Sequence, residues 1–239
     1  MWSSCDAAAL MLDWSYRLSD FLLFSPRVYW RLFELNNEAL WPLPLVTLAL
    51  GLTALALALL RPRHHGRLIA ILLAILWGFV GWSFLWQRYA TINWAAAYVA
   101  PLFALEALLL VIIGGMLGRL AVGRRGFGRI AAFALLALGL GYPLLAPLFG
   151  RPWQGAEFFG AAPDPTVIAT LGFLLLARGR SAALLYPIPL LWCLASSVTL
   201  WAMDDAQAWV PLAVAVLAVV AIVIHLFETA RYRPLPSKQ

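Results

Sequence analysis

Apolar residues occur along this chain in long runs that polar residues interrupt only briefly. An α-helix of about 20 residues crosses the roughly 30 Å hydrocarbon core of a bilayer, because each residue advances the helix by about 1.5 Å. The runs therefore predict an all-α integral membrane protein with seven transmembrane helices. The predicted spans cover residues 41–60, 67–87, 95–118, 130–149, 165–178, 182–202 and 207–227.

The first 40 residues form the longest polar stretch, and their pattern differs from that of the apolar runs. Between Phe21 and Glu38, aromatic and leucine side chains alternate with arginine and glutamate. This pattern predicts an amphipathic helix, broken near Pro26, that lies on the membrane or packs on the helix bundle. Asp6 and Asp13 replace the basic start of a signal peptide, so we expect no cleaved leader. The predicted organisation is a segment 1–40, a transmembrane domain 41–229 and a tail 230–239.

Composition supports the membrane assignment and excludes several classes of site. Hydrophobic residues make up 64% of the chain and charged residues 12%, whereas a soluble domain is near half apolar and a quarter charged. Only Cys5 and Cys193 occur, and histidine does not cluster with them. We therefore expect no metal site. We also expect no enzymatic activity, because the sequence does not bring together a set of catalytic residue types.

Lysine and arginine are distributed unequally between the two sides of the predicted bundle. Twelve lie on the side that carries the tail, and five lie on the side that carries the amino terminus. Because cytoplasmic loops collect basic residues, this bias predicts an external amino terminus and a cytoplasmic carboxy terminus. The bias also explains the net charge of +6. Basic residues divided among short loops form no continuous surface, so nucleic-acid binding is not expected.

The first three and the last three predicted spans share ordered sequence features. A Pro-x-Pro motif opens the first span of each half, a Leu-Trp pair lies in the second, and an aromatic-Val-Pro-Leu pattern opens the third. These matches predict two parallel repeats, 41–118 and 163–227, joined by a linker helix 130–149. In such a repeat Trp77 superposes on Trp192. Pro101 superposes on Pro211.

Polar and aromatic residues gather on the side of the bundle that carries the amino terminus. Such residues cap helix ends and line membrane interfaces, and Asp164 before Pro165 has the pattern of a helix N-cap. The same residues can form a vestibule that binds a solute. The candidate binding residues are Asn36, Asn37, Glu38, Trp41, Arg88, Asn93, Arg151, Asp164 and Thr166.

The two asparagines before the first span carry a specific geometric prediction. We expect Asn36, Asn37 and Glu38 to fold over the mouth of the bundle and to meet Asn93 and the segment 158–166. Amides suit this place because each amide both donates and accepts hydrogen bonds. The cations expected for the Glu38 carboxylate are Arg88 and Arg151.

Two ionisable residues lie inside predicted spans. Glu106 falls near the middle of its span, where a carboxylate is costly. It is either part of a functional site or a protonated acid bonded to a backbone carbonyl. His225 lies near the cytoplasmic end with Glu228 one turn later, which favours an interfacial His–Glu pair. Ligation of a porphyrin or chlorin by His225 is the alternative, and the cofactor is otherwise unknown.

Five short segments carry a resemblance to a known family. Through them the chain, from about Phe21 onward, resembles a family of bacterial multi-pass membrane proteins catalogued only as a domain of unknown function. Members often carry cysteine where this chain has Asp164, so a thiol-based role is not expected there. The resemblance implies the bacterial inner membrane and no specific activity. The segments are "NNEALWP" (36–42), "TIN" (91–93), "GYPLLAPLFG" (141–150), "FFGAAPDPT" (158–166) and "PLLWCLASS" (189–197).

Two functions from different classes remain open. The three-one-three layout resembles the SWEET sugar-efflux transporters, without their Pro-Gln pair, and favours a small-solute permease or solute-binding membrane protein with a polar outer vestibule. The alternative is a structural or assembly subunit of a larger redox or photosynthetic membrane complex. Twelve tryptophans and close-packing pairs such as Gly114 and Gly118 favour this alternative. The expected partners are membrane lipid and a second copy of the chain or a larger complex.

Overall fold

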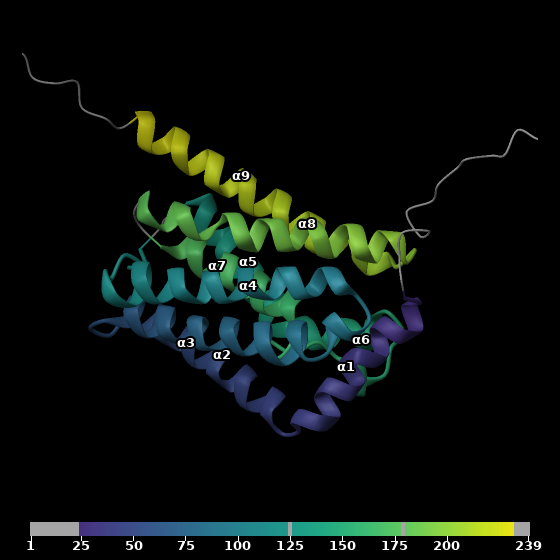
Figure 1. Cartoon of the computed structure of the whole chain (residues 1–239). Helices are drawn as coiled ribbons and strands as arrows, with labels where there is room; N and C mark the ends of the chain where they lie inside the picture. Colours follow the sequence, from purple (N-terminus) through teal and green to yellow (C-terminus); the bar gives the residue numbers. More distant parts are fainter. Residues whose placement is uncertain (1–23, 124–125, 178–179, 232–239) are drawn as a thin grey trace, which may run out of the picture.

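The computed structural model describes residues 24–123, 126–177 and 180–231, and the chain is helical throughout these ranges apart from turns and single bridges (Figure 1). The all-α prediction is therefore confirmed. The longer helices are α1 (Pro26–Leu40), α2 (Leu43–Leu60), α3 (His65–Val80), α4 (Trp94–Leu109), α5 (Phe127–Gly141), α7 (Pro163–Leu176), α8 (Pro187–Ala202) and α9 (Trp209–Arg231). Shorter helical segments are η2 (Gly81–Trp86), η3 (Tyr89–Thr91), η4 (Leu110–Met116), η5 (Tyr142–Leu144), α6 (Leu145–Leu148), η6 (Trp153–Gly155), η7 (Arg180–Leu185) and η8 (Ala206–Ala208).

In the described part of the chain, six helical segments are long and apolar enough to cross a membrane. They are Leu43–Leu60, His65–Thr91, Trp94–Met116, Phe127–Leu148, Ala182–Ala202 and Ala206–Phe227. Leucine and alanine dominate them, and both residues favour the helix. The predicted fifth span, 165–178, corresponds to α7, which has only 14 residues. Its length of about 21 Å falls short of the roughly 30 Å of a bilayer core. The predicted count of seven spans is thus not confirmed.

The short helix α7 occupies the centre of the fold. Every residue from Pro163 to Leu176 is buried. Glycines let α7 pack backbone to backbone on α5: a Cβ atom added to Gly139 would lie 2.7 Å from the Ala169 nitrogen, and one added to Gly172 would lie 2.9 Å from the Ala132 oxygen. A helix that is apolar on all sides suits a protein interior as well as lipid. Hydropathy alone therefore could not distinguish a helix buried in protein from a helix in lipid.

The remaining helices surround α7, with α1 at one end of the bundle (Figure 1). The helix α3 packs between α2 and α4, and α8 packs on α9. At the end opposite to α1, the Gly123 nitrogen donates to the Leu176 oxygen at 2.9 Å. The carboxyl end of α7 therefore meets the segment that precedes α5.

The predicted amphipathic segment forms α1, which packs on the bundle. Its buried residues are Tyr29, Leu32, Phe33, Asn36 and Asn37, whereas Val28 and Leu35 stay exposed. The helix begins at Pro26, with the Ser25 side chain accepting a hydrogen bond from the Val28 nitrogen. Proline at the first helical position needs no N–H partner, so Pro26 starts α1. The part of the predicted amphipathic segment before residue 24 lies outside the described residues.

The three-one-three repeat is not confirmed. The helices that open the two halves lie in different environments, since α2 exposes Leu52 and Leu59 whereas α7 is buried along its whole length. The matched prolines also differ, because Pro101 is exposed and Pro211 is buried. Leucine- and alanine-rich helices can share such short patterns through composition alone.

Candidate functional site

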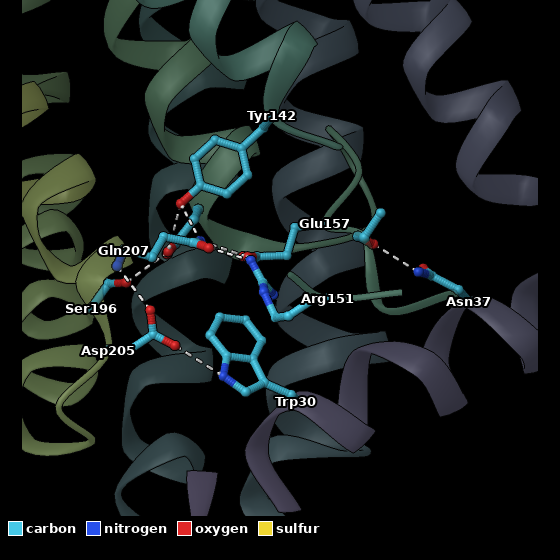
Figure 2. Close-up of polar contacts among 10 residues, drawn as sticks. Trp30, Asn37, Tyr142, Arg151, Glu157, Ser196, Asp205 and Gln207 are labelled. Carbon is cyan, nitrogen blue, oxygen red and sulfur yellow. Dashed lines mark hydrogen bonds and ion pairs between the residues drawn. The ribbon is translucent and has the colours of Figure 1, made fainter. Parts of the chain in front are cut away.

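Polar side chains from distant parts of the sequence meet at the α1 end of the bundle (Figure 2). They come from α1, η5, the 149–162 loop, α7, α8 and the 203–208 loop. We call this group the polar cluster. Its members are Trp30, Tyr142, Arg151, Glu157, Asp164, Trp192, Ser196, Asp205 and Gln207.

Asp164 lies in the first turn of α7 and accepts three hydrogen bonds. The Trp192 indole nitrogen donates to Oδ1 at 2.6 Å, the Ser196 hydroxyl donates to Oδ2 at 2.7 Å, and the Tyr142 hydroxyl donates to Oδ2 at 3.4 Å. The positive end of the helix dipole also favours a carboxylate here. The predicted N-cap role is wrong, because the N-cap is Ala162 and the Asp164 side chain turns toward α8.

Gln207 links the hydrogen bonds around Tyr142 to Glu157 and Arg151. Its Nε2 donates to the Tyr142 hydroxyl at 3.0 Å and to Oε1 of Glu157 at 2.9 Å, and its Oε1 accepts from Arg151. Glu157 also lies 3.6 Å from the Arg151 guanidinium. Burial and the neighbouring Asp164 carboxylate raise the pKa of Glu157 to about 8, although Arg151 and Gln207 act in the opposite direction.

The guanidinium of Arg151 is the cation of the polar cluster, and it lies over an aromatic ring. Its Cζ lies 3.5 Å from the centroid of the Trp30 ring, and the Trp30 nitrogen donates to Oδ2 of Asp205 at 3.1 Å. Stacking of this kind stabilises a guanidinium where water is excluded. Within the described part of the chain, Nε and Nη1 of Arg151 are buried without a hydrogen-bond partner. The cluster thus retains two donors that a ligand or water can meet.

The predicted contact between the two asparagines and the 158–166 segment is present in part. Nδ2 of Asn36 donates to the Ala161 oxygen at 3.3 Å, whereas Nδ2 of Asn37 donates to Gln154 and Ala156 at 2.8 and 2.7 Å (Figure 2 shows Asn37). Asn93 takes a different role. Its side chain accepts from the Ala95 nitrogen at 3.1 Å and donates to the Tyr89 hydroxyl at 3.2 Å, so it caps α4 and does not join the asparagines.

The predicted pairing of Glu38 with Arg88 or Arg151 is wrong. Arg88 donates to Oδ1 of Asn36 at 2.9 Å, and Arg151 lies in the polar cluster. Glu38 is exposed. Thr166 stabilises the 149–162 loop, since its hydroxyl accepts from the Gly160 nitrogen at 2.8 Å and donates to the Ala162 oxygen at 2.7 Å.

A groove of about 850 Å³ lies between α1, the start of α2 and η6. We call it the α1–α2 groove. Three predicted binding residues, Asn37, Glu38 and Trp41, line it. Arg31 and Glu34 form an ion pair with each other on its wall. The other lining residues are Leu45, Trp153, Gln154 and Phe158.

A smaller cavity of about 120 Å³ lies between α4 and α8. We call it the α4–α8 cavity. Its volume equals about four water molecules at roughly 30 Å³ each. Half of its lining residues are polar, in a bundle whose interior is largely apolar. The lining consists of Tyr29, Tyr89, Asn93, Ala95, Ala96, Val99, Trp192, Ala195, Ser196 and Thr199.

Glu106 lies deeper along α4, and it is fully buried. Neither of its carboxyl oxygens has a hydrogen-bond partner among the residues that the structure describes. The predicted alternative of a bond to a backbone carbonyl is therefore wrong. His225 lies partly buried near the end of α9. No three His, Cys, Asp or Glu side chains stand close enough to hold a metal ion within residues 24–123, 126–177 and 180–231.

Sequence reasoning missed several members of the polar cluster. Ser196 had a usable signal, because a hydroxyl within an apolar run needs a partner. Gln207 and Tyr142 had none, because their side-chain partners come from other segments, between 22 and 65 residues away. Trp192 was noted only as a repeat position, and Trp30 only as one of many aromatic residues.

Comparison with known proteins adds a family and no activity. Neither characterised proteins nor solved structures gave a match. A family model described as a family of unknown function, DUF6064, matches residues 26–233. This match covers every helix described above, from α1 to α9. The chain therefore belongs to the DUF6064 family.

Proposed function

We propose that this protein is a small-solute permease, with the solute held in the α4–α8 cavity. The observation that carries the proposal is this cavity between two helices, whose mainly apolar wall carries the polar side chains of Asn93, Ser196 and Thr199. Solute sites in helical proteins commonly lie between helices, with a few polar groups on an apolar wall. The cavity volume of about 120 Å³ limits the solute to a small molecule.

The α1–α2 groove supplies the vestibule of this proposal. Trp41 is 63% exposed and Trp153 is 54% exposed, so both rings are accessible at the groove. Indole rings commonly lie at the headgroup level of a membrane, which would place the groove at the interface with water.

The proposed membrane arrangement includes α7 as a seventh crossing. Asp164 in its first turn bonds to Tyr142 after α5, and Leu176 at its end bonds to Gly123 before α5. The chain therefore changes ends of the bundle along α7, sheltered from lipid by its neighbours. With seven crossings the amino terminus lies outside and the carboxy terminus inside. Fluorescent tags on the two ends should report opposite sides, and same-side signals would contradict the arrangement.

Solute entry into proteoliposomes tests the permease. Vesicles that carry the protein are mixed with glycerol, urea or methylammonium, and swelling is followed by light scattering. At least one solute should enter faster than in protein-free vesicles. Ala96→Leu, which fills the cavity, should remove this gain, whereas Ala104→Leu at an exposed position of the same helix should keep it. Equal rates in the two variants, or no gain with any solute, would contradict the proposal.

The second candidate is a structural or assembly subunit of a larger membrane complex. The polar cluster supports it, because most of its members bond to one another and tie loops to helices. In this case the protein should migrate in native gels of its source membrane as part of an assembly several times its own mass of 26.3 kDa. Migration as a monomer or dimer would contradict this candidate.

A further inference from the structure

Glu106 has no evident structural purpose in the bundle. It is fully buried, and both carboxyl oxygens lack a partner among the residues that the structure describes. An ionised carboxylate without a partner in an apolar interior is strongly disfavoured, so the side chain carries a proton. A purely structural position in an apolar helix face would be better filled by leucine or methionine.

Among the residues that the structure describes, no charged side chain bonds to Glu106. The elements packed on α4 are α3, η2, η3, η4, η7 and α8. Their titratable residues lie near the ends of helices, apart from the Cys193 thiol of α8. Those whose side chains the structure describes are His65 and Arg67 on α3, Tyr89 on η3 and Cys193 on α8.

A single aromatic layer separates Glu106 from the α4–α8 cavity. Val99 lines the cavity, and Phe103 and Glu106 follow it on the same face of α4, one and two turns deeper. The Phe103 ring lies 4.4 Å from the Trp77 ring and 5.1 Å from the Trp192 ring, measured between centroids. Trp192 also lines the cavity. Phe103 therefore lies between the polar cavity and the acid.

We propose that Glu106 is a proton-binding site, which exchanges its proton with water that passes the Phe103 layer from the α4–α8 cavity. The exchange is the transfer of the carboxyl proton to water, which leaves a carboxylate and a hydronium ion, and its reversal. The role of this site rests on the proposed permease function, because the solute and the exchanging water would use the same cavity. Acids inside membrane bundles serve as proton relays for the same physical reason.

Infrared spectroscopy of the purified protein in lipid nanodiscs tests the proton site. The wild-type protein should show the carbonyl band of protonated carboxylic acids, and the difference spectrum between wild type and Glu106→Gln should contain the contribution of Glu106, separate from that of Glu157, which both proteins keep. The band should shift after transfer to D₂O and weaken as the pH rises. A missing band at neutral pH, or a band that neither exchanges nor titrates, would overturn the proposal. Glu106→Leu gives the same comparison if the glutamine variant does not fold.

The role of the aromatic layer has its own matched pair of variants. Phe103→Leu should shift the Glu106 band faster after D₂O transfer, because the layer becomes thinner. Phe173→Leu makes the same change at an equally buried ring of α7 outside the layer, and it should exchange at the wild-type rate. Equal acceleration in both variants would mean general loosening and would overturn the route.

These spectra distinguish the inference from the permease function. They need no transported solute, so the band can exchange in a protein that fails the swelling assay. Conversely, solute entry that Ala96→Leu blocks, together with a Glu106 band that does not exchange, would leave the permease standing and remove the proton site.

Discussion

Asp164 and Glu106 are both buried carboxyl groups, and their surroundings differ completely. Asp164 is 3% exposed and accepts hydrogen bonds from Tyr142, Trp192 and Ser196. Glu106 is 0% exposed and, in the described part of the chain, accepts none. Burial alone therefore does not tell what a carboxyl group does. The donors around it decide whether it stabilises the fold or stays available for chemistry.

The difference follows from position along the helix. Asp164 lies in the first turn of α7, where loops and the ends of neighbouring helices bring polar side chains close. Glu106 lies well inside α4, where its carboxyl oxygens meet no hydrogen-bond donor among the described residues. Polar partners are thus concentrated at one end of the bundle.

Removal of the Asp164 carboxyl should have the largest effect on stability. Asp164→Ala leaves two buried hydroxyls and an indole N–H without their acceptor. We expect the free energy of unfolding to fall by roughly 3 to 5 kcal/mol. Denaturant titration followed by tryptophan fluorescence measures this loss. A fall no larger than that of Glu38→Ala, an exposed carboxyl, would mean that the cluster contributes little.

The pH dependence of stability should report on Glu157. This buried carboxyl has fewer hydrogen-bond donors than Asp164 and more than Glu106. Its raised pKa means that the folded protein holds the proton more tightly than the unfolded chain, from about pH 4.5 to about pH 8. The free energy of unfolding should therefore fall as pH rises through this window. Glu157→Gln should flatten the profile, and an unchanged slope in this variant would contradict the assignment.

Removal of one donor should cost less than removal of the shared acceptor. Trp192→Phe keeps most of the ring and deletes the N–H that bonds to Asp164 at 2.6 Å. We expect a loss of about 1 kcal/mol, because two other donors remain. Trp201→Phe, at an exposed position of the same helix, is the matched control and should change stability little. Thermal unfolding of both variants checks the difference.

Replacement of Glu106 should have the smallest effect on stability. Glu106→Leu strands no partner and exchanges a buried acid for an apolar side chain of similar volume. We expect the free energy of unfolding to stay within about 0.5 kcal/mol of wild type or to rise. A loss comparable to that of Asp164→Ala, in the same denaturant assay, would show that Glu106 has a structural partner.

The positions of most helices could be predicted from hydropathy. The predicted spans 130–149, 182–202 and 207–227 agree closely with Phe127–Leu148, Ala182–Ala202 and Ala206–Phe227. The exception is α7. An apolar run indicates that a helix is shielded from water, but it does not indicate whether lipid or protein shields it. Its 14 residues are short for a bilayer and long enough to cross a bundle.

The candidate site was predictable only as a location. Asn36, Asn37, Arg151 and Asp164 all gather at the α1 end, as the alternation of loops implies. Their partners were not predictable. Arg151 meets Trp30 and Gln207, and neither contact has a signal in the residues next to it.

The sequence by itself determined that the chain forms apolar helices, because a run of leucine and alanine satisfies its backbone only within the helix. It also determined which ends of those helices carry polar groups. Only the tertiary structure decided that Asp164 is satisfied and Glu106 is not. Hydrogen bonds between side chains depend on how each helix is rotated and how closely it packs. Those quantities arise from contacts between residues far apart in the chain, such as Tyr142 with Gln207.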